Sequence, residues 1–151
     1  MKLAEALIVR KDLQTRLEEL RERLILNALV QEDEEPAEKP KELLIELDKV
    51  TKQLEDLMTR INLTNAAVSI EGSSLTAMLA KRECEMHKLS ILRRFLNEAN
   101  NTVLRSSRLE VKIYSTVSVA ELRKQTDRLS EALRKLDMTI QAANWATDLQ
   151  E

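Results

Sequence analysis

The sequence predicts a mainly α protein: two long antiparallel helical hairpins that form a four-helix, coiled-coil-like bundle, with one short β element. Leu, Ala, Glu, Lys and Arg fill 83 of the 151 positions, a composition typical of long helices. Apolar residues recur every three or four positions over long stretches, which is the period of an amphipathic helix. One stretch alternates instead, and it predicts the β element. With one Gly in the whole chain, the Gly-rich loops through which many enzymes bind nucleotides are absent.

A first helix is predicted over residues 1–31. Its leucines, from Leu3 to Leu24, fall on the three/four spacing that keeps one apolar stripe facing a partner helix. Arg10 and Asn27 lie on that same stripe. Polar groups in an apolar seam lower stability but specify register or oligomeric state, so we interpret both residues as seam positions. A buried polar site is the alternative.

A second helix, from about Lys41 to Asn65, closes the first hairpin, which spans residues 1–65. The acidic connector over residues 32–40 contains five acidic residues that repel one another and two prolines that disfavour helix. The second helix carries two apolar stripes, one of Leu44, Leu47, Leu54, Met58 and Ile61, the other of Leu43, Val50 and Leu57. This face is wider than a two-stranded seam needs, so we expect burial against at least two neighbours.

A short break over residues 66–73 separates the two halves of the chain. Alternating apolar and polar residues around Val68 indicate a brief extended piece, and Gly72 can take the positive φ that a turn requires. One of the two serines after Gly72 is expected to cap the next helix by accepting a hydrogen bond from a free backbone N–H. That helix is predicted over residues 74–100.

The period of the pattern changes after the third helix. Residues 109–115 alternate, with Leu109, Val111 and Ile113 on one side, and this is the clear strand signal of the chain. A lone strand leaves its backbone hydrogen-bonding groups unpaired. We therefore expect it to pair with residues 67–71 or with another subunit.

The fourth helix is predicted over residues 119–147, opened by the capping box Ser118-Val119-Ala120-Glu121. It carries the cleanest heptad stripe of the chain, and Trp145 lies off that stripe. Because an exposed indole is unfavourable, we expect Trp145 to fill a pocket between elements or subunits. Residues 1–151 are thus expected to form a single helical domain.

Charge is unevenly distributed, although the formal net charge is only −2. Residues 1–64 carry a net charge of −4 and residues 81–112 a net charge of +4. The pattern favours complementary surfaces between helices or subunits, and an anion-binding stripe is the alternative. The aromatic residues are too few and scattered to stack bases, so nucleic-acid binding would depend on phosphate contacts.

The expected location is the cytoplasm. The N-terminus does not read as a signal peptide, because Glu5 interrupts its apolar stretch. No run approaches the ~18 apolar residues of a spanning helix. Cys84 is the only cysteine, so no disulfide forms within the chain.

Glu83, Cys84 and His87 are the candidate metal ligands, because their spacing of three and four places each pair on one helix face and all three types bind Zn²⁺. Three ligands from so short a stretch rarely complete a tetrahedron, so we expect no metal and no cofactor. Cys84 and His87 are also the one plausible nucleophile–base pair, without an evident oxyanion site. We therefore expect no enzymatic activity.

Several stretches together carry a resemblance to a known family: Met1-Lys2-Leu3-Ala4-Glu5-Ala6-Leu7, Asn27-Ala28-Leu29-Val30-Gln31-Glu32, Arg60-Ile61-Asn62-Leu63-Thr64-Asn65 and Asp137-Met138-Thr139-Ile140-Gln141-Ala142-Ala143-Asn144-Trp145-Ala146-Thr147-Asp148-Leu149. Over nearly its whole length the chain resembles the septicolysin-like family of small bacterial proteins. The resemblance implies a helical, oligomeric protein without an established activity. The chain departs from the family at Ala80-Lys81-Arg82-Glu83, where an Ala-x-Arg-Asp stretch is expected. If an acidic partner matters there, Glu83 substitutes for it.

The function expected from the sequence is that of a structural or interaction module, a non-enzymatic, cytoplasmic helical homo-oligomer. Binding to a different protein is a further option. A membrane-active septicolysin-type lysin and a weak anion- or nucleic-acid-binding module are the alternatives. The evidence for membrane or nucleic acid is not strong. The residues expected at subunit contacts are Leu43, Val50, Leu57, Leu109, Val111, Ile113 and Trp145.

Overall fold

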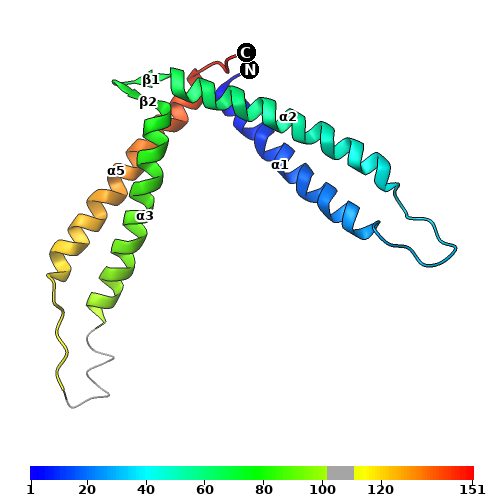
Figure 1. Cartoon of the computed structure of the whole chain (residues 1–151). Coiled ribbons are helices and arrows are strands. Elements are labelled where there is room, and N and C mark those ends of the chain that lie inside the picture. The colour runs from blue at the N-terminus through cyan, green and yellow to red at the C-terminus, as the bar shows by residue number, and fades with distance from the viewer. Residues whose placement is uncertain (102–110) are drawn as a thin grey trace. The chain divides into compact units, whose positions relative to one another are not determined.

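The structure is a computed structural model that describes residues 1–101 and 111–151 (Figure 1). Its elements are α1 (Leu3–Leu26), α2 (Pro40–Ala67), β1 (Ser69–Ile70), β2 (Ser73–Ser74), α3 (Leu75–Asn100) and α5 (Val119–Ala146). The predicted class, mainly α with helical hairpins and one small β element, is confirmed.

The described chain divides into two compact units, where the sequence predicted a single domain. Unit 1 contains residues 1–74 and 143–151, and unit 2 contains residues 75–142. In unit 1 α1 and α2 lie side by side, and in unit 2 α3 lies beside α5 (Figure 1). The packing of all four helices into one bundle stays a prediction.

The core of unit 1 is the seam between α1 and α2. Leu20, Leu43 and Val50 form its centre and expose 0%, 3% and 1% of their surface, and Leu13, Leu17 and Leu24 pack against them. Leu57 continues the buried stripe one heptad further along α2. Because these leucines are buried from water by residues of the same chain, the hydrophobic effect holds the hairpin together.

This seam corrects the first set of expected subunit contacts. Leu43, Val50 and Leu57 were predicted to face another subunit, yet all three are buried within one chain. The physical reason is proximity: α1 is tethered to α2 by a short connector, so it reaches this stripe at a small cost in loop entropy.

Helix α1 ends at Leu26, five residues before its expected end at residue 31. The connector therefore begins at Asn27 and runs to Lys39, just before Pro40 opens α2. Proline is well suited to the first position of a helix, because its missing N–H would have no intrahelical partner there.

Both chain termini belong to unit 1, and they pair with each other. Lys2 and Asp148 form an antiparallel bridge. The backbone N–H groups of Leu3 and Leu149 each donate a hydrogen bond of 2.9 Å across it. The Lys2 ammonium lies 2.9 Å from a carboxylate oxygen of Asp148, and this hydrogen bond lowers the pKa of Asp148.

Helix α2 holds the C-terminal tail in place. Arg60 donates from Nε to the carbonyl of Gln150 at 2.8 Å, and the Gln150 N–H donates to the Thr64 hydroxyl at 3.0 Å. Thr64 is fully buried, and Leu149 exposes only 7% of its surface. The tail is therefore an integral part of unit 1.

The β element is a local hairpin of β1 and β2. Ser69 pairs with Ser74, and Ile70 pairs with Ser73. The two residues of the turn, Glu71 and Gly72, have φ values of 51° and 83°. Two positive φ values in succession define the tight turn that matches the twist of antiparallel strands, as predicted for Gly72.

The expected pairing of residues 109–115 with residues 67–71 was wrong, and pairing with another subunit stays a prediction. Residues 111–115 form no strand, while Leu109 lies outside the described residues. Val111 exposes 69% of its surface, and Ile113 is half-buried in a hollow beside Phe95. An alternating stretch becomes a strand only with a partner, and β2 already pairs with β1.

Unit 2 is built on the α3–α5 hairpin. Its buried contacts include Leu89 from α3 and Leu122 and Leu133 from α5. Helix α5 begins where the capping box predicts, since the Ser118 hydroxyl accepts a hydrogen bond of 3.3 Å from the Glu121 N–H.

The seam of unit 1 makes a first prediction about stability. Leu20→Ala should lower the free energy of unfolding by about 2–5 kcal/mol, because it leaves a cavity in the centre of the seam. The control Ile45→Ala, at a side chain that is 63% exposed on the same hairpin, should change it by about 0.5 kcal/mol or less. Urea unfolding followed by circular dichroism measures both. Equal effects of the two substitutions would contradict the assignment of the seam.

Candidate interaction site

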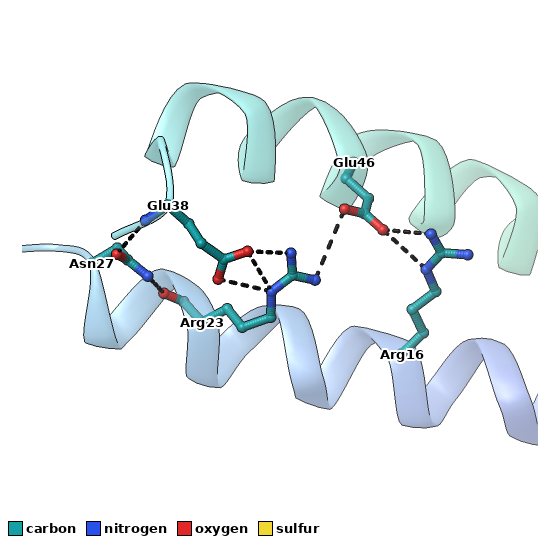
Figure 2. A network of polar contacts seen from close by, with 5 residues as sticks. All are labelled: Arg16, Arg23, Asn27, Glu38 and Glu46. Carbon is teal, nitrogen blue, oxygen red and sulfur yellow. Dashed lines mark hydrogen bonds and ion pairs between the residues drawn. The ribbon is translucent and has the colours of Figure 1, made fainter. Parts of the chain in front are cut away.

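One side of the unit 1 hairpin is closed by a ladder of ion pairs between α1 and the α2 side (Figure 2). Arg23 binds both carboxylate oxygens of Glu38, with Nη2–Oε1 at 2.6 Å and Nε–Oε2 at 3.0 Å. Glu46 lies 4.0 Å from Arg23 and accepts a hydrogen bond from Arg16 Nε at 3.1 Å. A shared carboxylate thus links the two arginines of α1.

The ion pair between Arg23 and Glu38 shifts the pKa of both side chains. The hydrogen bond from Arg23 lowers the pKa of Glu38, and the same bond raises the pKa of Arg23. Each side chain keeps 40% of its surface exposed. Because water screens such exposed charges, the ladder contributes modestly to stability and chiefly orients the helices.

Asn27 closes the connector end of the same hairpin. Its amide Nδ2 donates to the Arg23 carbonyl at 2.8 Å, and its Oδ1 accepts from the Glu38 N–H at 2.9 Å. The residue exposes only 8% of its surface. Asn27 directly follows the last residue of α1, where its side chain adds a second hydrogen bond to the Arg23 carbonyl, which also accepts one from the Asn27 backbone N–H at 3.2 Å, and anchors the connector. Its role as a polar seam position stays a prediction. Arg10, the other predicted seam residue, is half-exposed on α1.

The opposite side of the hairpin is apolar and open. Four side chains of α2, which we call the open stripe, occupy it: Leu44, Leu47, Leu54 and Met58. Leu44 exposes 51% and Met58 40% of its surface, and the other two are half-buried. At about 100° per residue, the open stripe lies about 40–120° around α2 from Val50, on the side away from Glu46.

The open stripe is the first of the two predicted stripes of the second helix without its last member, Ile61, which is fully buried. Helix α1 covers the Val50 stripe, and burial of the wide face against a second neighbour stays a prediction. Asp48 and Glu55, both exposed, lie along the outer edge of the open stripe. This side therefore combines apolar side chains with negative charge.

Unit 2 carries a groove between α3 and α5 with a different charge. Leu89 and Leu133, both buried, line a hollow of about 420 Å³ together with the exposed Met86. Its polar lining consists of Arg82, Arg134, Asp137 and Ser130, a net charge of +1. An apolar floor with arginines at its rim suits an apolar segment that carries acidic residues.

Two arginines of α3, Arg82 in the groove and Arg93 next to it, are held by α5. Arg82 Nη1 lies 2.7 Å from Asp137 Oδ1. Arg93, one turn beyond Leu89, donates to the Ser130 hydroxyl at 3.3 Å. The acidic partner of Arg82 therefore comes from the facing helix and not from its neighbour Glu83.

The candidate metal ligands do not form a cluster. Glu83, Cys84 and His87 are all exposed on α3. Glu83 and His87 line an open hollow next to Arg82 and Met86, whereas Cys84 is not among its lining residues. Across residues 1–101 and 111–151, no three His, Cys, Asp or Glu side chains are close enough together to hold a metal ion.

Trp145 is exposed over 57% of its surface. The prediction that it fills a pocket between elements of the chain was therefore wrong, and contact with another subunit stays a prediction. The physical reason lies in its neighbours: Ala143 and Asn144 take the buried face of the last turns of α5, so the next residue points outward.

The two units differ strongly in net charge. Unit 1 contains 11 basic and 18 acidic residues, a net charge of −7. Unit 2 contains 13 basic and 8 acidic residues, a net charge of +5. The opposite charge blocks seen in the sequence thus coincide with two structural units, and the open stripe and the groove lie on units of opposite sign.

The fold defines a class of protein, built from two antiparallel helical hairpins that follow one another in the chain with a β-hairpin between them. The model of a family of unknown function (DUF6847) matches residues 10–149, so the chain belongs to this family. The chain is similar to the crystal structure of a functionally unknown conserved protein from Corynebacterium diphtheriae, with a TM-score of 0.94, 38% sequence identity and 99% of each chain covered. No curated protein matches the chain.

These comparisons do not test the resemblance to septicolysin-like proteins, which stays a prediction. The similar solved structure comes from a bacterium, in line with the bacterial origin that the resemblance implies. Within the described part of the chain, no helix combines the length and the apolar composition needed to cross a membrane.

The anchoring role of Asn27 predicts a loss of stability in Asn27→Ala. The substitution leaves the Glu38 N–H without its partner and removes one of the two hydrogen bonds to the Arg23 carbonyl, which should cost about 1–3 kcal/mol of unfolding free energy. Asn27→Asp keeps the acceptor for the Glu38 N–H and should cost less. Urea unfolding measures both, and two variants as stable as the natural chain would refute the role.

The ion-pair ladder predicts a defined dependence on pH. Folding lowers the pKa of Glu38, so its contribution is complete above the ordinary value of 4.5 and is lost as the pH falls below it. Glu38→Gln should therefore lower the urea midpoint at pH 7, and the difference from the natural chain should shrink between about pH 4.5 and pH 3. Glu34→Gln, at an exposed residue of the connector, is the control. Its urea midpoint should differ little from that of the natural chain at every pH.

Proposed function

We propose that this protein is a non-enzymatic interaction module that works as a homo-oligomer of helical hairpins. The observation that carries the proposal is the open stripe of α2. Leu44 and Met58 expose 51% and 40% of their surface on a helix whose other stripe is fully used. A continuous apolar stripe at helical spacing is costly to leave in water, and packing against another helix removes that cost.

Further exposed apolar side chains support a surface for association. In unit 1, Ile25 and Leu26 expose 62% and 78% of their surface, and Trp145 exposes 57%. Tryptophan is enriched at the energetic centres of protein interfaces. The absence of a ligand cluster from the described residues leaves association between surfaces as the activity that the geometry favours.

The proposal predicts the mass of the protein in solution. Light scattering coupled to size-exclusion chromatography at micromolar concentration should give a mass of at least twice the 17.4 kDa of one chain. Leu44→Gln combined with Met58→Gln should weaken association about ten- to a hundredfold, because each substitution removes apolar area from the interface.

A matched control uses the same helix and the same kind of change. Ile45→Gln combined with Leu63→Gln alters two side chains of α2 that are 63% and 53% exposed but lie away from the open stripe. This control should keep the mass of the natural protein. A monomeric natural chain would overturn the proposal, and so would equal effects of the two double variants.

A further inference from the structure

We propose that the groove between α3 and α5 receives the open stripe of α2 from a second copy of the chain. This inference rests on the proposed function, because it names the surfaces through which copies associate. It commits to one occupant, a second copy, for which the argument is complementarity of charge and of apolar pattern. Each copy carries both surfaces, one on each unit.

The groove and the open stripe both present leucine and methionine side chains. The groove offers the buried Leu89 and Leu133 and the exposed Met86 as its floor. The open stripe places Leu44 and Met58 four turns apart on one side of α2, with half-buried leucines between them. Side chains that recur at helical spacing are the anchors by which a helix lies in an apolar groove.

The charges at the rims are opposite. Arg134 of α5 lines the groove. Arg93 lies on α3, one turn beyond the floor residue Leu89, and donates a hydrogen bond to Ser130. Asp48 and Glu55 lie along the outer edge of the open stripe, seven residues apart, and both are exposed. Glu55 also pairs with Lys52 of the same helix at 3.5 Å. Opposite charges around an apolar contact steer association and select the register, while like charges suppress wrong pairings.

The net charges of whole units favour the same pairing. Contact between two copies of unit 1 brings together surfaces that each carry −7, and contact between two copies of unit 2 brings together +5 and +5. Only unit 1 against unit 2 is attractive at long range.

A charge-swap experiment tests the pairing. The first variant, Asp48→Lys with Glu55→Lys, reverses the charge at the edge of the open stripe. The second variant, Arg93→Glu with Arg134→Glu, reverses the charge at the rim of the groove. Each variant alone should associate at least about tenfold more weakly than the natural chain, since like charges then face each other. An equimolar mixture should recover natural association, because each reversed surface finds its complement.

The control variant, Glu34→Lys with Glu35→Lys, makes the same change of charge in unit 1 but on the exposed connector. It should associate as the natural chain does. Analytical ultracentrifugation measures all variants at low and at 1 M salt, and the natural affinity should fall at high salt as the charges are screened. Circular dichroism shows whether each variant is folded.

The outcomes separate this inference from the proposed function. A natural chain that is an oligomer, with swaps that leave its mass unchanged or that are not rescued by mixing, overturns the pairing and leaves homo-oligomerisation standing. A monomeric natural chain overturns both. If the groove instead serves nucleic acid, the Arg93→Glu and Arg134→Glu variant loses binding to a labelled oligonucleotide while its mass stays natural, and this result also overturns the pairing.

Discussion

A pair of helices can bury only one stripe of each partner, and α2 carries two. The Val50 stripe is buried against α1, around Leu20, and its side chains are almost completely removed from water. The open stripe, displaced by part of a turn around the same helix, then has no helix of unit 1 left to cover it. The exposed apolar surface of unit 1 follows from this constraint, and so does the proposal that the protein associates with copies of itself.

Polar contacts decide which side of the hairpin stays open. The ladder from Arg16 to Glu38 closes one side, and Asn27 anchors the connector beneath it (Figure 2). At the other end, the bridge between Lys2 and Asp148 joins the two termini. Because both ends and one side of unit 1 are tied by hydrogen bonds, its free apolar side is presented on a well-ordered frame. A preordered surface loses little conformational entropy when it binds.

The division of charge gives the chain a direction for association. An acidic hairpin and a basic hairpin in one polypeptide repel their own kind in other copies and attract the opposite kind.

Much of the fold was determined by the sequence alone, because helical periodicity, prolines and capping residues are local signals. The start of α5 at Ser118 and the turn at Gly72 were predicted correctly for this reason. The sequence also showed that α2 has two stripes, yet it could not tell which of them α1 would cover, since both satisfy the same spacing. Nor could it show that Asn27 ends α1 by bonding Glu38, eleven residues away, or that Trp145 is exposed. Those outcomes depend on which distant segments meet, and only the tertiary structure decides that.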